Sequence, residues 1–393
     1  MAGYIFNLDS IESLKLYVDN GVYSTKINYP GNHWKGYQEA TFADYATMKA
    51  GDNVYFFIDR KIYGIGELIN ISGDCKFSNF PLLSSVDSPL AISCDEINGE
   101  SLWSENVPKD KFQPWVCFFK PSPYFFTEGI DMDDVLVSNP DAFKMLRAFW
   151  KVSFIKFDSE ENQALKSIIL KFNQDYLNEE NNKHIFNSSY IENHAQVENK
   201  IQNGDYALDV RSILSFAVVE DGRIKHEMAL EAGILFQLFY RYNETVEMFG
   251  SWDYLSHQVI ASPFKPIDYM DKMDIFGSKF ITGFSPIKSK YLVIELKKDS
   301  GNEQDIDQLM KYVDWIKDEY CHGDYSMIDA FLVAFDFSDD INTYKNNNAI
   351  RNYIVGRRPA KSLKWDNLKI VKYIYNRELD RIEFLINQES NAD

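Results

Sequence analysis

The sequence predicts a protein of two domains, an α+β domain built on short strands and an α/β domain with a mixed sheet. Its length of 393 residues is enough for two domains that each bury a core. Residues 1–175 contain short strand-like runs separated by turns, whereas residues 207–393 alternate apolar runs with helical spacing. Residues 176–206, between them, are polar and poor in core formers, which is typical of a partly helical connector.

The composition indicates a folded protein and gives no sign of a zinc site or a disulfide framework. Apolar residues make up 45% of the chain and aromatic residues 15%, which excludes a disordered chain. No apolar run is long enough to span a membrane, and the N-terminus lacks the features of a signal peptide, so we expect a cytoplasmic protein without membrane contact. Metal-ligand spacing is absent from the cysteines, which we expect to be reduced core thiols: Cys75, Cys94, Cys117 and Cys321.

The net charge of −18 argues against a protein that coats nucleic acid indiscriminately, because such binding depends on neutralising phosphates. Any nucleic-acid contact must therefore be local or assisted by metal ions. A basic stretch near the C-terminus, opposed only by Asp366, is either a solvated edge or a phosphate-binding surface. Its basic residues are Arg351, Arg357, Arg358, Lys361, Lys364, Lys369 and Lys372, of which Arg357, Arg358 and Lys361 are the phosphate-binding candidates.

The first domain contains a clear hairpin. Residues 54–58 are an apolar strand that follows the turn at residues 51–53, and residues 62–69 form the returning strand. Gly64 and Gly66 in the returning strand permit a bulge or a close approach of another backbone.

The end of this domain is predicted from a strand and a helix. Residues 147–156 have the pattern of a closing strand, and Ser159 is placed to cap the helix that follows. The apolar stripe by which this helix is expected to dock consists of Leu165, Ile168, Ile169 and Phe172.

Three segments of the first domain resemble the EVE branch of the PUA-like fold. Residues 36–41, 48–57 and 65–68 correspond to that family's Asn-Tyr-Gln segment, Met-Lys-x-Gly-Asp turn and Gly-Ile-(Ala/Gly)-Glu strand, although Gly36 replaces the asparagine. Residues 21–25 are similar to the Trp-Ser-Thr segment of the related YTH domains, with a tyrosine in place of the tryptophan. The resemblance implies a β-barrel with helices that senses a modified base.

A base removed from its stack needs flat apolar walls and a few polar atoms that read its edge. The alternative for each aromatic candidate is an ordinary place in the core. The candidate walls are Tyr23, Trp34, Tyr37, Trp103 and Trp115, and Gln38 is the candidate edge reader.

The second domain carries the residues with the clearest chemistry. Residues 291–294 form an apolar strand that ends in Glu295-Leu296-Lys297, where alternation places Glu295 and Lys297 on one face. Asp274 enters a short strand, expected to stop at a turn at Gly277, that is the natural hairpin partner. Asp274 and Glu295 can then meet across the pair, giving two carboxylates for a hard divalent cation and a lysine to orient or deprotonate a water.

These residues resemble the PD-(D/E)XK nuclease superfamily, in which a helix glutamate precedes Asp, Glu-x-Lys and often a helix with Gln and Tyr. Glu227 and Glu231 lie one helical turn apart, so either is the candidate helix carboxylate, and Gln308 precedes Tyr312 by one turn. The family's Pro before the Asp is absent here. The alternative is that these are surface charges of an α/β domain.

The resemblance implies a role for each residue of the motif. Asp274, Glu295 and the Leu296 carbonyl would bind Mg²⁺, which Mn²⁺ can replace, and Lys297 would position or activate the attacking water. The helix carboxylate would support the metal or its water shell. Gln308 would contact the nucleic-acid backbone or orient Lys297.

The remaining elements predict a restriction-endonuclease-like core. Residues 305–319 have the spacing of a crossover helix, and residues 330–335 are apolar throughout, which indicates a central parallel strand. Residues 368–375 alternate and are expected at an edge.

The sequence therefore predicts a Mg²⁺-dependent endonuclease targeted by a base-reading domain, resembling modification-dependent restriction or antiviral (phage-defence) nucleases. DNA is preferred to RNA as the substrate because the superfamily mostly cuts DNA. A homodimer or larger homo-oligomer is expected, since one such site cuts one strand. The alternatives are a mismatch- or branch-specific DNA repair nuclease, and a non-catalytic nucleic-acid reader or interaction module.

Overall fold

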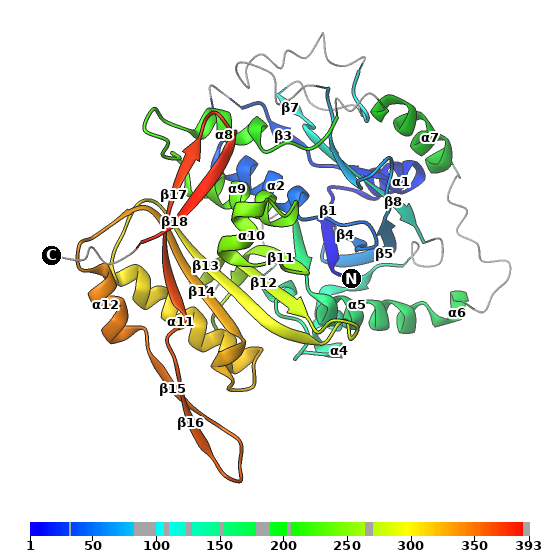
Figure 1. The fold of residues 1–393 in the computed structure, drawn as a ribbon. Coiled ribbons are helices and arrows are strands. Elements are labelled where there is room, and N and C mark those ends of the chain that lie inside the picture. Colours follow the sequence, from blue (N-terminus) through cyan, green and yellow to red (C-terminus); the bar gives the residue numbers. More distant parts are fainter. Residues whose placement is uncertain are drawn as a thin grey trace. The chain divides into compact units, whose positions relative to one another are not determined.

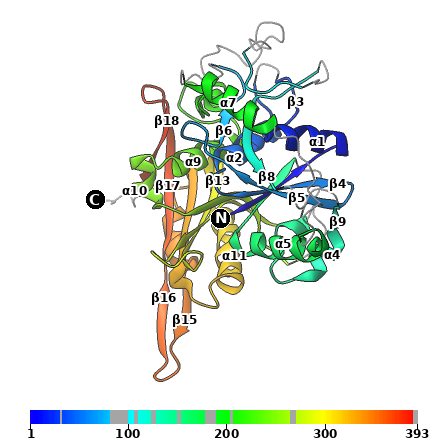
Figure 2. The same cartoon turned by 90° about the vertical axis from the view of Figure 1, so that its right-hand side faces the viewer.

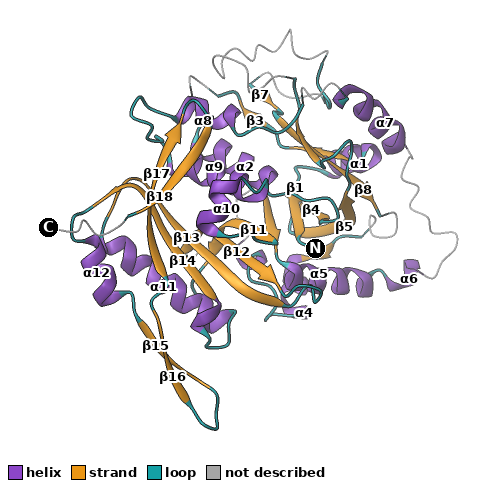
Figure 3. Ribbon diagram, viewed as in Figure 1, coloured by secondary structure: helices purple, strands orange, loops and turns teal. Residues whose placement is uncertain are grey.

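The computed structural model describes residues 1–30, 33–81, 100–105, 110–122, 128–148, 153–177, 189–202, 206–263 and 270–387. The chain divides into two compact units, Met1–Ser212 and Ile213–Asp393, each of which combines helices with a sheet (Figures 1 and 3). Two units that each combine helices and strands agree with the predicted organisation at this coarse level. The boundary between them, after Ser212, falls slightly later than residue 207, where the second domain was expected to begin.

Unit 1 is organised around one large sheet in the strand order β10-β1-β4-β5-β8-β2, with β6 paired to β8 and β9 to β5. Strands β1 and β4 are parallel and the other pairs are antiparallel. The strands are β1 (Gly3–Asn7), β2 (Val22–Ser24), β4 (Asn53–Ile58), β5 (Lys61–Leu68), β6 (Lys76–Ser78), β8 (Trp115–Pro121), β9 (Ile130–Asp131) and β10 (Phe154–Phe157), beside a separate ladder of β3 (Ile27–Asn28) and β7 (Lys111–Phe112).

Helices of unit 1 connect these strands and cover part of the sheet. Helix α5 packs against β1 and β10, and α2 packs against β8. The described helices are α1 (Ile11–Asn20), α2 (Gly36–Ala46), α4 (Met132–Ser138), a 3₁₀-helix (Leu146–Ala148), α5 (Ser159–Phe172), α6 (Gln174–Leu177), α7 (Ser189–Ile201) and α8 (Arg211–Ala217), the last spanning the division between the units.

The predicted β4–β5 hairpin is confirmed. Its two-residue turn, Asp59-Arg60, has positive φ angles of 45° and 66°, which suit the twist of a tight hairpin. The register shifts between Val54 and Phe56, and a Cβ on Gly66 would lie 2.6 Å from the Val54 side chain. The expected bulge and close approach are therefore both present.

The end of the first domain differs from its prediction. Strand β10 begins only at Phe154, because Leu146–Ala148 forms a 3₁₀-helix, and residues 149–152 lie outside the described part. Asp158, not Ser159, caps α5 by accepting hydrogen bonds from the amides of the first helical turn. Leu165 and Ile169 are buried as expected, whereas Phe172 is exposed at the end of the stripe.

The predicted connector is packed into unit 1 where the structure describes it. Helix α7 packs on α1, with the Ser189 hydroxyl and the Asn193 amide donating to carbonyls at the end of that helix. The imidazole of His194 lies 2.8 Å from the Gly21 carbonyl. Residues 178–188 and 203–205 lie outside the described residues.

Unit 2 is organised around a six-stranded mixed sheet in the order β11-β12-β13-β14-β17-β18. Strands β13, β14 and β17 are mutually parallel, and the outer pairs are antiparallel. The strands are β11 (Tyr254–Ile260), β12 (Lys272–Phe280), β13 (Lys288–Gly301), β14 (Ile328–Phe337), β17 (Leu368–Asn376) and β18 (Arg381–Ile386).

A separate hairpin and several helices complete unit 2. Helix α9 packs on β13, and α11 packs on β13 and β14. The hairpin consists of β15 (Arg351–Val355) and β16 (Lys361–Trp365); the helices are α9 (Glu227–Phe239), α10 (Asn243–Phe249), α11 (Glu303–Glu319), a 3₁₀-helix (Tyr325–Met327) and α12 (Ile341–Asn348).

Most predicted elements of unit 2 are confirmed. Helix α11 is the crossover between parallel β13 and β14, and β14 is central and almost entirely buried. Two expectations are wrong. Strand β17 is not an edge, because β18 pairs along its outer side, and β12 does not stop at Gly277 but continues through it to Phe280.

The composition led to expectations about the cysteines and about membrane-spanning helices. Cys75, Cys117 and Cys321 are buried free thiols, and Cys94 lies outside the described residues. Within the described part of the chain, no helix combines the length and apolarity needed to cross a bilayer.

Gly21 provides a test of the packing around α1. It ends this helix at φ 59°, and a Cβ there would lie 2.6 Å from the Phe119 carbonyl oxygen. We expect Gly21→Ala to lower the free energy of unfolding by about 1–3 kcal/mol, because both the left-handed backbone and the contact oppose a side chain. Gly36→Ala is the matched control: a Cβ at this first residue of α2 meets nothing within 4 Å and should be neutral or slightly stabilising. Urea denaturation of both variants measures the difference, and equal stabilities would contradict the assignment.

Candidate functional site

Strands β12 and β13 hold two carboxylates side by side. They pair antiparallel with Ile275 opposite Ile294, a register that brings Asp274 next to Glu295. The neighbouring apolar side chains on both strands are buried and fix which face of each strand points inward. The main-chain amide of Leu296 donates a hydrogen bond of 2.8 Å to Asp274 Oδ2. The predicted meeting of the two carboxylates is therefore built into the hairpin register.

Lys297 lies on the same face of β13 as Glu295 and donates to its Oε1 at 2.8 Å. Glu295 is 1% exposed, and its second oxygen, Oε2, is buried without a hydrogen-bond partner. The Lys297 ammonium also lies 3.9 Å from Glu227 and 3.7 Å from Asp305. One cation is thus shared among three carboxylates, and one buried carboxylate oxygen remains open to a ligand.

Burial and neighbouring charges shift the pKa values of Asp274, Glu295 and Lys297. Burial, together with the negative charges of Glu295 and Glu231, raises the pKa of Asp274 well above its ordinary value. Burial also raises the pKa of Glu295 to about 7, against the opposing effect of Lys297. Burial acts to lower the pKa of Lys297, but the surrounding carboxylates outweigh it and raise the pKa. The lysine is therefore held in its charged form.

The two candidate helix carboxylates occupy different places. Glu231, in the second turn of α9, is buried and lies 2.6 Å from His257 Nδ1. Gln258 Nε2 donates to Glu231 Oε2 at 2.9 Å and lies 3.3 Å from Asp274 Oδ1, so it links the two carboxylates. Glu227, at the start of α9, has a side chain that is 45% exposed and faces Lys297. Glu231 thus belongs to the Asp274 side of the site and Glu227 to the lysine side.

Three residues near the site were not predicted from the sequence: His257, Gln258 and Asp305. Gln258 has a φ of 50°, a conformation that costs free energy in a residue with a side chain and is typical of functional sites. Asp305 closes a capping box with Asn302 at the start of α11, a pattern that is visible in the sequence. No comparable pattern marks the polar pair in β11.

Of the two roles predicted for Gln308, orienting Lys297 is not seen among the described residues, and contact with the nucleic-acid backbone stays a prediction. The Nε2 of Gln308 donates to the Tyr312 hydroxyl at 2.7 Å, one turn along α11. Burial, followed by the negative charge of Glu295, raises the pKa of that hydroxyl. In the described part of the chain, the partners of the Lys297 ammonium are carboxylates rather than Gln308.

The carboxylates of the site suit a divalent cation that keeps part of its water shell. Among the described residues, no three His, Cys, Asp or Glu side chains form a ready metal site. Mg²⁺, however, commonly uses one or two carboxylates and completes its shell with water and substrate phosphate. Asp274 and Glu295 suit this mode, because the unpaired Oε2 of Glu295 and the mutual repulsion of the two groups are what a cation relieves. The third predicted ligand is the main-chain carbonyl of Leu296, which lies between Glu295 and Lys297 in β13.

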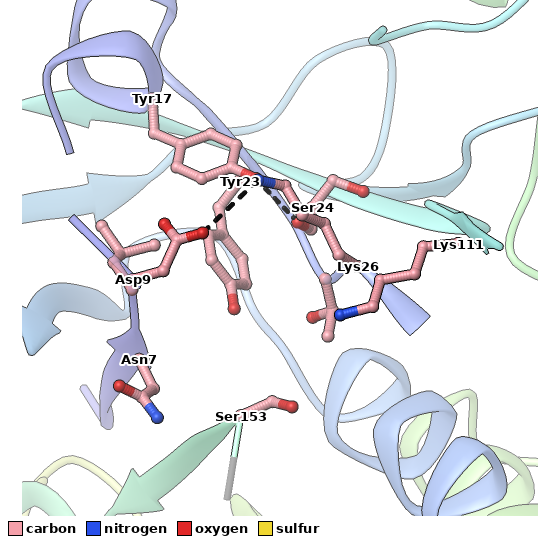
Figure 4. A pocket seen from close by; sticks show the side chains of 10 residues that line it. Asn7, Asp9, Tyr17, Tyr23, Ser24, Lys26, Lys111 and Ser153 are labelled. Carbon is pink, nitrogen blue, oxygen red and sulfur yellow. Dashed lines mark hydrogen bonds and ion pairs between the residues drawn. The ribbon is translucent and has the colours of Figure 1, made fainter. Parts of the chain in front are cut away.

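Unit 1 contains a cavity of about 340 Å³, within the range of roughly 300–1,000 Å³ typical of small-ligand sites (Figure 4). The Tyr17 hydroxyl donates to the Ser24 carbonyl at 3.1 Å, which fixes one wall. The ring of Tyr23 stacks on Phe6 with centroids 4.0 Å apart. The lining residues are Asn7, Leu8, Asp9, Tyr17, Tyr23, Ser24, Thr25, Lys26, Lys111 and Ser153.

Charged side chains of both signs reach this cavity. Lys26 forms an ion pair with Glu105 and lies 4.0 Å from Asp9 (Figure 4 labels Lys26 and Asp9). Burial raises the pKa of the hydroxyls of Tyr17 and Tyr23, so both phenols are neutral donors. The cavity therefore combines aromatic walls with hydrogen-bonding groups that can read the edge of a planar ligand.

Of the six predicted base-binding residues, Tyr23 lines this cavity and the other five do not. Trp34 and Trp115 are core residues with ring centroids 5.5 Å apart, and the Trp34 indole donates to the Ser212 carbonyl at 2.7 Å. Trp103 is also buried. Tyr37, by contrast, is 47% exposed on α2. Burial does not separate the two groups, because Tyr23 is itself only 3% exposed; the difference is that Tyr23 lines the cavity and the other five do not.

Gln38 also has a different place from the one predicted. Its side chain accepts a hydrogen bond of 2.8 Å from the Lys35 amide and donates one of 2.7 Å to the Asn28 carbonyl. It is fully buried and closes the start of α2. The side chain predicted to read a base edge is thus used to hold the helix.

The C-terminal basic residues separate into paired and unpaired groups. Arg351 pairs with Asp314, Lys364 with Asp366 and Lys372 with Asp336, whereas Lys369 lies over the ring of Phe331. The predicted phosphate-binding residues are exposed at the end of the β15–β16 hairpin, and within the described residues their side chains have neither an ion pair nor a hydrogen bond: Arg357, Arg358 and Lys361.

No protein-family model matches this chain, and no curated protein matches it in sequence. Among solved structures, a repair endonuclease from Pyrococcus abyssi is 22% identical over 24% of this chain, with a TM-score of 0.16. That match spans 36% of the endonuclease, about a third of its length. A protein from Pseudomonas putida is 14% identical over 43% of this chain and 99% of its own, with a TM-score of 0.25. A protein from Agrobacterium tumefaciens is 16% identical over 44% of this chain and 93% of its own, with a TM-score of 0.24. At such low TM-scores, none of these similarities establishes a shared fold or function.

Because its carboxylates lie close together, the site is expected to lower the free energy of unfolding. Asp274→Asn removes an ionisable group whose charged form is disfavoured at this half-buried position, while keeping an acceptor for the Leu296 amide. We expect the Tm of the variant in metal-free buffer to rise by about 2–4 °C, the shift that about 1 kcal/mol produces in a domain of this size. Asp339→Asn, an exposed aspartate, is the control and should leave the Tm unchanged. A lower Tm for Asp274→Asn in calorimetry would show that the carboxylate stabilises the fold.

Proposed function

We propose that this chain is a Mg²⁺-dependent endonuclease that cleaves phosphodiester bonds of DNA and that unit 1 directs it to a flipped, modified base. The observation that supports this best is the site on β12 and β13, where Asp274 and Glu295 lie beside Lys297 and one buried carboxylate oxygen has no partner. In this proposal unit 2 has a PD-(D/E)XK core, and unit 1 is a PUA-like domain of the EVE type.

Asp274, Glu295 and the Leu296 carbonyl would hold the cation, Mg²⁺ or Mn²⁺. When bound, the ion supplies a Lewis acid for the scissile phosphate. The register of the β12–β13 hairpin presets the distance between the two carboxylates, so the chain needs no rearrangement to present them. Their desolvation increases the electrostatic effect of any cation that binds there.

Lys297 acts as a hydrogen-bond donor in this mechanism. Because the neighbouring carboxylates raise its pKa, it is protonated at neutral pH and cannot take the proton of a water molecule. Glu295 accepts one of its N–H groups at 2.8 Å, which orients the ammonium and leaves other N–H groups for the attacking water or a phosphate oxygen. Of the two predicted roles, positioning the water therefore fits better than deprotonating it.

The two α9 carboxylates support different parts of the site. Glu231 acts through Gln258 on Asp274 and fixes the orientation of that carboxylate. Glu227, which is partly exposed, adds negative charge near Lys297. Glu231 is therefore the positioning residue on the metal side.

The cavity of unit 1 is the proposed base site. Its volume suits a small planar ligand, and Tyr23 offers an aromatic wall beside the hydrogen-bonding groups of the lining. A role in restriction or antiviral defence follows if the base it accepts is modified. Cutting both strands of a duplex requires two such sites, so the active form is a homodimer or larger assembly.

Lys297→Ala is expected to lower the rate of DNA cleavage with Mg²⁺ by orders of magnitude, as are Asp274→Ala and Glu295→Ala. Truncating Lys297 removes the only cation that contacts Glu295 in the described part of the chain. Lys298→Ala is a matched control, because this neighbouring lysine is 46% exposed and points to the opposite face of β13. Single-turnover cleavage of a panel of unmodified, cytosine-modified and adenine-modified duplexes measures the effect. If Lys297→Ala cleaves at the rate of the Lys298→Ala control, the proposed role of Lys297 is wrong.

Tyr23→Ala is expected to weaken binding to the preferred modified duplex by about 1–3 kcal/mol, the value of one stacking wall, without changing binding to the unmodified duplex. Lys111→Ala, a half-buried residue at the cavity, is a second variant that leaves the aromatic core intact. Tyr37→Ala is the control, because Tyr37 is exposed outside the cavity. Titrations with both duplexes give the selectivity. If neither cavity variant differs from Tyr37→Ala, the cavity does not read the base.

A further inference from the structure

The β15–β16 hairpin is a basic ribbon that extends away from the six-stranded sheet of unit 2 (Figures 1 and 2). Residues 351–365 contain five basic residues and no acidic one, in a chain with a net charge of −18. All residues from 356 to 364 are exposed. Four of these five basic residues are exposed, and only Arg351 is partly buried.

The charges of the ribbon are neutralised at its base and open at its tip. Arg351, at the start of β15, makes a two-pronged contact with Asp314 at 2.9–3.2 Å, and Lys364 lies 3.0 Å from Asp366. At the tip, the described residues provide no partner for Arg357, Arg358 or Lys361. The positive potential is therefore concentrated at the far end of the ribbon.

The base of the ribbon is anchored on one face. Tyr353 and Trp365 both pack against Tyr325, with ring centroids 5.6 and 6.2 Å apart respectively. The Trp365 indole donates to the Ile328 carbonyl at 3.1 Å. This anchoring fixes the direction of the ribbon and also takes its two aromatic side chains out of use as stacking surfaces.

The side chains on the opposite face of the ribbon are exposed to solvent. Cross-strand pairing puts Asn352 beside Lys364 and Ile354 beside Ser362, and all four side chains are exposed, Ile354 by 71%. This face offers amide and hydroxyl groups, one apolar contact and one lysine.

We propose that the β15–β16 hairpin binds the groove of a nucleic-acid duplex, with Arg357, Arg358 and Lys361 on the phosphates that border it. The DNA substrate rests on the proposed function, but the ribbon's binding does not require an active site. A two-stranded ribbon fits a major groove about 12 Å wide, and its five-residue strands reach about 17 Å. Duplex is favoured over single strand because the ribbon's aromatic rings are packed against Tyr325 and cannot stack on bases.

The test uses the full chain with Arg357→Ala, Arg358→Ala and Lys361→Ala combined, and measures fluorescence anisotropy with an unmodified duplex in EDTA, so that no cleavage occurs. We expect affinity at low salt to fall by at least about tenfold. Between about 50 and 200 mM salt, the slope of log K against log salt should fall by about three, one for each lost phosphate contact. The charge-matched control replaces the exposed lysines Lys49, Lys61 and Lys171 by alanine and should keep the original slope.

The result that would overturn the proposal is an unchanged affinity and salt slope in the tip variant, or no duplex binding by the unaltered chain at low salt. If the tip variant instead changes sedimentation while its duplex affinity is unchanged, the ribbon binds a second copy of this chain and not nucleic acid. Asn352→Ala combined with Ser362→Ala, which keeps all the charges, should lower affinity without changing the slope. A failure of the proposed nuclease activity alone would leave these binding results intact.

Discussion

The unit 2 site depends on one constraint, which is that two adjacent antiparallel strands hold the half-buried Asp274 beside the buried Glu295. Burial raises the pKa of both carboxyls, and nearby negative charges raise each of them further. The surrounding groups offset this repulsion in part: the Leu296 amide and Gln258 on Asp274, and Lys297 on Glu295. The compensation is incomplete, because Glu295 Oε2 has no partner. An incompletely compensated negative site attracts a divalent cation, whose charge could in turn bind a phosphate.

The support of this site comes from elements that are distant in sequence. Helix α9 contributes Glu231, and β11 contributes His257 and Gln258, which hold the helix carboxylate against the hairpin. The start of α11 brings Asp305 close to Lys297 through its capping box. The positive φ of Gln258 is a local cost that its two hydrogen bonds help to offset. The site is therefore a property of the packed sheet and not of a single motif.

The distribution of charge fits a protein that would contact nucleic acid at a few points. With a net charge of −18, nonspecific attraction to phosphate is weak. Three of the seven basic residues between Arg351 and Lys372 are paired with aspartates, and the three that have no partner among the described residues are concentrated at the tip of the β15–β16 hairpin. The cavity of unit 1, lined by Asp9, Lys26 and Lys111, has both signs of charge and would discriminate by hydrogen bonding rather than by attraction.

The sequence by itself determined the elements whose pattern is local. The run ending in Glu295-x-Lys297 specifies a strand with both charges on one face, and the β4–β5 hairpin and helix α11 follow from turn residues and spacing in the same way. Only the tertiary structure decided which side chains face a cavity. Trp34 and Trp115 were expected at a pocket but lie in the core, whereas Tyr23 lines the cavity, because the lining of a cavity depends on segments that meet from far apart in the chain. The edge position of β18 and the bridge made by Gln258 are likewise set by packing, since no local pattern encodes which strand or carboxylate will lie next to them.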